Sequence, residues 1–199
     1  MIPIYIEVGA KRAFASALEW YGWTRSGRDS EAAQAALLAY APRYAPVARA
    51  AGLRLPEGPE LEVIETVAGD ASTDFGVPGK PAAWDSRPFA AGEVERMIAL
   101  LEATWSVFDR VVAKAPAELR KGPRGGGRDR DKIVEHVAGA HDAYGRKLGV
   151  KKAGRAELAE ALRRVASEGP PERGWPARYA ARRTAWHALD HAWEIEDRS

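Results

Sequence analysis

Apolar residues recur at spacings of three and four through most of the chain after residue 90, and this periodicity limits the fold more than any other feature. The four stretches with this spacing are 90–114, 129–148, 155–167 and 179–196. In the first of them Val94, Ile98, Leu101 and Trp105 would lie on one face of a long helix. Four such helices separated by loops predict an all-α up-down four-helix bundle over residues 90–199.

The first 89 residues have a mixed pattern, which predicts a small α/β module and makes the whole chain an α+β protein. A helix is predicted over 31–40, with Pro42 and Pro46 expected to break it or to start a new turn. Residues 68–89 are rich in Gly, Pro, Asp and Ser and predict a long irregular connection. The predicted strands are 2–8, 12–18 and 61–67, with a further strand or loop at 20–24.

The composition excludes several kinds of site and partner. The chain has no cysteine, so disulfides, thiolate ligands and a cysteine nucleophile are excluded, which is consistent with a cytoplasmic protein. A net charge of +2 is too small to argue for nucleic-acid binding. The N-terminus lacks a signal-peptide pattern, and no run of eighteen apolar residues occurs, so we expect no membrane association.

Two of the four histidines, His187 and His191, are spaced by one helical turn in the last predicted helix. Residues four apart share a face, so both imidazoles could reach one metal ion. No Glu directly follows the first histidine, as a zinc-protease helix would need. His136 and His141 in the 129–148 helix lie about 140° apart around its axis, so only one can join the pair. We favour His136 as the third ligand, and His141 is the alternative.

Three neutral imidazoles would leave coordination positions open for water or substrate, which is typical of a catalytic metal site rather than a structural one. An ion held there would lower the pKa of a bound water or polarise an oxygen or thiol ligand. Asp190 and Glu194 lie close along the same helix. They have two interpretations of equal weight, as partners of the ligand histidines or as solvated surface charges.

Other residue types near the histidines suggest weaker hypotheses. Arg178, Arg182 and Arg183 precede the pair and could hold an anionic substrate, although basic helical patches are usually solvated. The glycines at 125–127 lack the Lys and Ser/Thr of a phosphate-binding loop and are interpreted as a flexible loop. Four tryptophans are expected mainly to pack in the core, with the mouth of a pocket as the alternative: Trp105, Trp175, Trp186 and Trp193.

Residues 90–199 resemble the DinB-like superfamily of bacterial four-helix bundles. The resemblance rests on Val134-Glu135-His136-Val137 in the second helix and on Trp186-His187-Ala188-Leu189-Asp190-His191-Ala192-Trp193-Glu194 in the last. In that family one histidine of the second helix and two from the last bind a divalent metal, usually zinc or nickel. By position these correspond to His136, His187 and His191.

The resemblance also implies a chemistry and an assembly. The superfamily includes the mycothiol-dependent maleylpyruvate isomerase and bacillithiol transferases, and its bundles often form homodimers. Because this chain has no cysteine, a thiol would have to come from a cofactor such as mycothiol or bacillithiol. The first 89 residues resemble a HicB-like α/β module, through the first strand, the turn Trp23-Thr24-Arg25-Ser26-Gly27-Arg28-Asp29 and the helix from Glu31. This module would serve as a cap, a dimerisation surface or a pocket wall.

Two functional hypotheses follow. The first is a metal-dependent enzyme, a hydrolase or a thiol-dependent transferase or isomerase, that acts on a small molecule with activated water or thiol. The second is a non-enzymatic binding or stress-associated module, in which the metal is structural or absent. No catalytic residue or substrate is assigned by the sequence, because a fold-level resemblance implies a metal and a pocket more firmly than a reaction.

Overall fold

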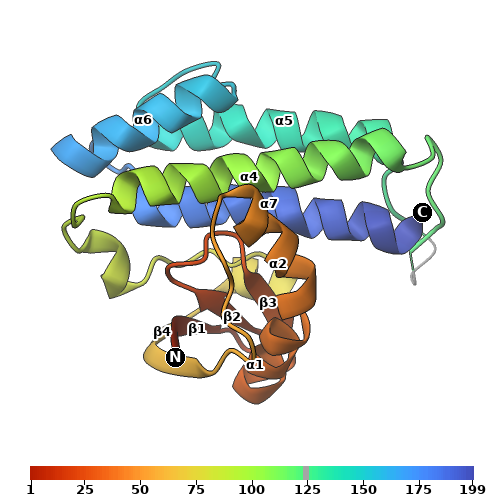
Figure 1. Cartoon of the computed structure of the whole chain (residues 1–199), viewed down its shortest axis with the longest axis horizontal. Helices are drawn as coiled ribbons and strands as arrows, with labels where there is room; N and C mark the ends of the chain where they lie inside the picture. The colour runs from red at the N-terminus through yellow and green to blue at the C-terminus, as the bar shows by residue number, and fades with distance from the viewer. Residues whose placement is uncertain (123–125) are drawn as a thin grey trace.

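The computed structural model describes residues 1–122 and 126–199, and it is a mixed α/β protein. A four-stranded sheet with its helices lies on one side of the long helices α4 and α7, and α5 and α6 lie on the other (Figure 1). Residues 123–125, which include the first glycine of the expected flexible loop, fall outside the described residues. Among the helices described, none is long and apolar enough to span a bilayer.

The sheet has the order β3-β2-β1-β4. β1 (Ile2–Val8) pairs antiparallel with β2 (Ala13–Ala17) and parallel with β4 (Leu61–Ala68), and β2 pairs antiparallel with β3 (Thr24–Gly27). These strands confirm three of the predicted segments. At 20–24, where a strand or a loop was expected, the chain forms a turn in which Gly22 adopts a φ of +91°. The loop alternative is therefore confirmed, and the third strand begins at Thr24.

Two short helices connect β3 to β4. α1 (Ser30–Ala39) begins at the N-cap Asp29, whose carboxylate accepts a hydrogen bond of 2.8 Å from the backbone N–H of Ala32. α2 (Ala41–Ala50) has Pro42 in its first turn. Proline is favoured there because the first backbone N–H groups of a helix have no partner within the helix, so the N–H that proline lacks is not missed. Pro46, by contrast, lies inside α2 and does not end it.

The connection before the long helices is more ordered than the sequence predicts. It contains a short helix α3 (Ala71–Phe75) and a 3-10 turn η1 (Ala83–Ser86). The buried carboxylate of Glu7 on β1 holds this segment, since it accepts hydrogen bonds from the Thr73 hydroxyl and from two backbone N–H groups of the connection. A buried polar anchor of this kind satisfies its own hydrogen-bonding needs by fixing the loop.

The four predicted long helices are present, as α4 (Glu93–Lys114), α5 (Arg130–Lys147), α6 (Arg155–Glu168) and α7 (Ala177–Arg198). The largest hydrophobic cluster contains side chains from both sides of residue 90, among them Trp23 and Leu101. α4 packs along α7 over most of its length. Several alanines of α7 are fully buried, and small side chains allow the helices to approach closely.

The directions of these helices differ from the strict alternation of an up-down bundle. Arg178 at the start of α7 bonds Glu93 at the start of α4 (2.9 Å), so these neighbours run parallel (Figure 1). Arg155 at the start of α6 bonds Asp109 near the end of α4 (2.6 and 2.7 Å), so α6 runs opposite to α4. α5 also runs opposite to α4 (Figure 1).

The loop between α5 and α6 explains this difference. Ala153, just before α6, packs so closely on Gly145 of α5 that a Cβ at Gly145 would lie 2.4 Å from the Ala153 Cβ. The chain therefore doubles back over the end of α5 before α6 begins. A glycine at this point makes the close approach sterically allowed.

Candidate metal centre

The three histidines favoured as ligands come together in the structure. His187 and His191 lie one turn apart on α7, and His136 reaches them from α5. Their candidate ligand atoms all lie within 4.8 Å of one another, and Nε2 of His136 is 3.1 Å from Nε2 of His187. The rings are also close, with centroids 4.7–5.0 Å apart. This group could therefore hold a metal ion.

The distance between His136 and His187 fits a shared ion. Zinc binds imidazole nitrogen at about 2.0–2.1 Å, so two such nitrogens on one tetrahedral ion lie about 3.3 Å apart. The separation of 3.1 Å between His136 and His187 is close to this value. Within the part of the chain that the structure describes, the group contains three histidines and no fourth histidine, aspartate or glutamate. Such a donor set leaves at least one coordination position for another ligand.

Burial favours the neutral form of two of the three histidines. His187 is 8% exposed, and burial together with the neighbouring His191 and Arg183 lowers its pKa from 6.5 to about 2. Burial also lowers the pKa of His136, with a smaller contribution from His191. A metal binds the neutral imidazole, so these two side chains are in the form that coordination requires.

Glu194 fixes the orientation of His191. Its Oε2 lies 2.8 Å from Nδ1 of His191, and because an ionised carboxylate only accepts, Nδ1 carries the proton and Nε2 is left for an ion. Arg198 donates to the other oxygen of Glu194 at 2.6 Å. The hydrogen bond from His191 is the main cause of the lowered pKa of Glu194. Of the two interpretations of Glu194, the structure therefore supports a hydrogen-bond partner of His191 over a solvated surface charge.

Asp190 has a different environment, although it is adjacent to His191. Its carboxylate pairs with Arg25 of β3 at 3.0 Å and joins α7 to the sheet. Arg198 was not singled out from the sequence as a partner of Glu194. The signal available was the spacing of four residues between a glutamate and an arginine on one helix.

His141, the alternative third ligand, is not part of the group. It is buried beside Trp105, with ring centroids 5.6 Å apart. Burial and the nearby Arg155 lower its pKa to about 4. Its Nε2 atom has no hydrogen-bond partner among the residues described, so His141 is a neutral core side chain.

The three arginines before the histidine pair have separate environments. Arg178 pairs with Glu93 (2.9 Å), and Arg182 forms a buried two-point ion pair with Asp85 (2.8 and 2.6 Å). Both are therefore neutralised within the fold. Arg183 makes no ion pair with any residue that the structure describes, and one of its terminal nitrogens is buried without a partner. Among the three arginines it is the one without a counter-charge in the part of the chain that the structure describes.

The aromatic residues near the centre mostly pack in the interior, as expected. Trp105, Trp186 and Trp193 are buried. Trp175 is half-buried, with its ring centroid 5.3 Å from that of Tyr144. The Tyr144 ring in turn lies 6.0 Å from His187, so an aromatic wall covers one side of the histidines.

Comparisons with family models, with curated proteins and with solved structures gave no match to this chain. The geometry of the three histidines therefore carries the functional argument by itself.

Proposed function

We propose that this chain is a metal-dependent enzyme, in which a divalent ion bound by His136, His187 and His191 supports hydrolysis or thiol transfer on a small molecule. The observation that carries the proposal is that three imidazoles from two helices converge with ligand atoms within 4.8 Å. Zinc and nickel both accept imidazole ligands. When bound, such an ion acts as a Lewis acid that lowers the pKa of a coordinated water or thiol.

The chain's own residues prepare the site for such an ion. Glu194 holds the proton of His191 on Nδ1, and Arg198 holds Glu194 in place. Ligand orientation by hydrogen bonds of this kind commonly changes metal affinity by about 10–100-fold. The buried position of His187 excludes water from one side of the site.

Arg183 supports an anionic substrate. It lies one turn before His187 on α7, and its guanidinium is 4.6 Å from the centre of the Trp186 ring and 5.7 Å from that of Tyr144. A guanidinium binds carboxylates in a planar, two-point geometry. We propose that Arg183 orients the anionic group of the substrate beside the histidines.

The DinB-like resemblance is part of the same proposal. It accounts for one histidine from the second long helix and two from the last, and it favours a low-molecular-weight thiol such as mycothiol or bacillithiol as cosubstrate. The absence of cysteine from the sequence requires that any thiol come from outside the chain. The DinB-like bundle, the homodimer and the cytoplasmic location remain predictions of the sequence.

Metal analysis tests the proposal directly. The protein is stripped with a chelator, reloaded with zinc or nickel, desalted and analysed for metal per chain. We expect about one ion per chain, its loss in His187→Ala, and its retention in the matched control His141→Gln. Failure of the reloaded protein to retain metal, or unchanged retention in His187→Ala, would contradict the assignment.

A cobalt-substituted protein distinguishes a catalytic site from a structural one. Addition of mycothiol or bacillithiol should produce a sulfur-to-cobalt charge-transfer band if a coordination position is open. A tightly held ion whose spectrum does not respond to thiol or to water-displacing anions would instead support the non-enzymatic alternative with a structural metal.

A further inference from the structure

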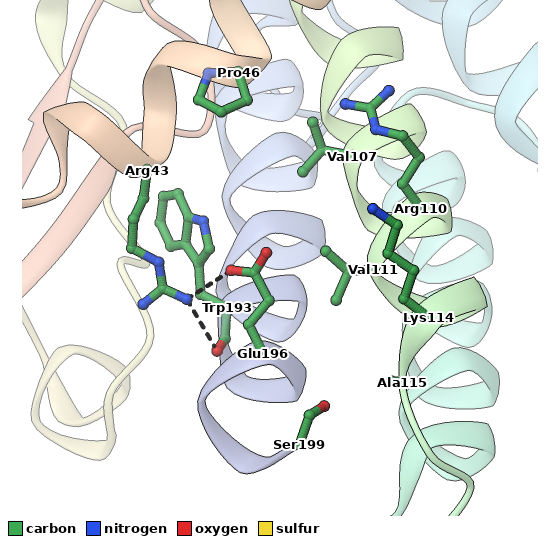
Figure 2. A pocket seen from close by; sticks show the side chains of 10 residues that line it. All are labelled: Arg43, Pro46, Val107, Arg110, Val111, Lys114, Ala115, Trp193, Glu196 and Ser199. Carbon is green, nitrogen blue, oxygen red and sulfur yellow. Dashed lines mark hydrogen bonds and ion pairs between the residues drawn. The ribbon is translucent and has the colours of Figure 1, made fainter.

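A cavity lies on another side of α7 from the histidines. Its volume is about 360 Å3, and side chains of α2, α4 and α7 line it (Figure 2). Trp193 on its wall is two residues beyond His191, which places it about 200° around the helix from that ligand. The cavity shares no lining residue with the histidine group, so it is a separate site.

Apolar side chains form part of the wall of this cavity. Val107 and Val111 lie one turn apart on α4, facing Trp193 of α7, and Pro46 of α2 closes one end (Figure 2). The indole is held in place by Tyr40, whose ring centroid is 5.0 Å away. Apolar walls of this kind, in a cavity of a few hundred Å3, are typical of sites for small molecules.

Cationic side chains outnumber carboxylate side chains in the lining of the cavity. Arg43 donates to Glu196 at 2.7 Å and also pairs with Asp197, so its charge is neutralised by the protein itself. Among the residues that the structure describes, Glu196 is the one carboxylate side chain that lines the cavity, and it is already paired with Arg43.

Two further cations lie along α4, one turn apart (Figure 2). They are Arg110, which donates to the Ser106 hydroxyl at 2.9 Å, and Lys114. Neither has a carboxylate within 4.0 Å among residues 1–122 and 126–199. A cavity with an apolar part of its wall and two such cations is complementary to a molecule that is apolar at one end and negative at the other.

We propose that this cavity binds a small amphipathic carboxylate. The apolar body of the ligand lies between Trp193 and the valines of α4, and its carboxylate is bound by Arg110 and Lys114. A guanidinium and an ammonium together can satisfy both carboxylate oxygens. Because α2 belongs to the N-terminal half and α4 and α7 to the C-terminal half, the ligand would also bridge the two halves.

Calorimetric titration with octanoate tests this site in the full-length protein, stripped of metal with a chelator so that coordination to an ion contributes nothing. We expect saturable binding of octanoate that weakens with added salt. We expect 1-octanol, which has the same chain without the charge, to bind at least about tenfold more weakly, because it gains no charge-assisted hydrogen bonds.

Variants locate the site. The double variant Arg110→Gln/Lys114→Gln should weaken octanoate binding at least about tenfold and leave octanol binding unchanged. The control Lys151→Gln, an exposed lysine away from the cavity, should have no effect. His187→Ala should bind octanoate normally, so a failure of the metal assignment leaves this test intact.

A second variant checks the apolar wall. Val111 is half-buried, and Val111→Phe should fill the cavity and abolish binding of both probes while thermal unfolding stays cooperative. The proposal is overturned if octanoate does not bind, if the two glutamine substitutions leave its affinity unchanged, or if octanol binds equally well.

Discussion

Replacing His141 by leucine tests how burial controls the protonation of a core histidine. His141 is 6% exposed, and burial followed by the nearby Arg155 lowers its pKa from 6.5 to about 4. The unfolded chain therefore takes up a proton at this residue at a pH where the folded chain does not. Since the folded pKa is the lower one, folding stability is retained above pH 6.5 and is lost as the pH falls toward 4.

The size of the effect follows from the two pKa values. The difference between 6.5 and about 4 corresponds to about 3 kcal/mol once both states are protonated, at about 1.36 kcal/mol per pKa unit. Between about pH 7 and about pH 5, only part of this difference develops, and the loss is about 2 kcal/mol. His187 adds its own loss in the same direction, but it is present in every variant compared.

Urea denaturation in the presence of a chelator measures this loss. The wild-type protein should lose about 2 kcal/mol more than His141→Leu between about pH 7 and about pH 5. His141→Gln is the matched control, because it removes the titration and keeps a polar side chain. It should share the flatter pH dependence but be less stable than His141→Leu at neutral pH, since the amide is left without partners.

The same pH dependence of stability in all three proteins would contradict this prediction. Strong destabilisation of His141→Leu at neutral pH would also contradict it. Such a result would mean that Nε2 of His141 makes a stabilising interaction, whereas it has no hydrogen-bond partner among the described residues.

Three further predictions concern other polar contacts. Asp85→Asn should destabilise the fold by about 3–5 kcal/mol in chemical denaturation, because it leaves Arg182 buried without a counter-charge; a cost near zero would contradict this. Glu194→Gln should weaken zinc binding about 10–100-fold in competition with a chromogenic chelator, and equal affinity would exclude Glu194 from orienting His191. Asp29→Ala should cost about 1 kcal/mol of stability through loss of the α1 N-cap, with thermal unfolding as the measurement.

The elements that the sequence predicts well are those whose cause is local. The long helices have apolar residues at helical spacing, and α4 begins and ends within a few residues of the expected 90–114. β1 and β2 are short apolar strands, and their positions are also confirmed. At 20–24 the sequence left a strand and a loop open, because a glycine between aromatic residues gives no local sign that it adopts a positive φ.

Contacts between distant segments could not be predicted in this way. The buried pair of Asp85 and Arg182 joins residues 97 positions apart, and Glu7 reaches a connection more than 60 residues later. From the sequence, Asp85 lies in a polar stretch and Arg182 in a basic patch. Only the packing of η1 against α7 removes both from water and makes them each other's partner.

The candidate metal centre depends both on local spacing in the sequence and on contacts between distant segments. The spacing of His187 and His191 is local and predicts a shared helix face, whereas the position of His136 depends on how α5 packs against α7. That packing uses a small hydrophobic cluster of its own, which includes Ile133 and Val137 of α5 and Ile195 of α7. Because His136 lies one residue before Val137, the contacts that bury the apolar side of α5 also bring its imidazole toward α7.

The number of donors and acceptors in the group favours an ion over a network of hydrogen bonds. His191 uses its Nδ1 proton for Glu194, so its Nε2 is an acceptor only. Nε2 of His136 and Nε2 of His187, 3.1 Å apart, can share one proton between them. Of the three possible pairs of histidines, at most one can therefore be joined by a hydrogen bond. A divalent ion, by contrast, accepts a lone pair from all three imidazoles at once. His187 is buried between the half-buried His136 and His191, which costs desolvation free energy, and coordination of one ion is the interaction that would offset this cost most completely.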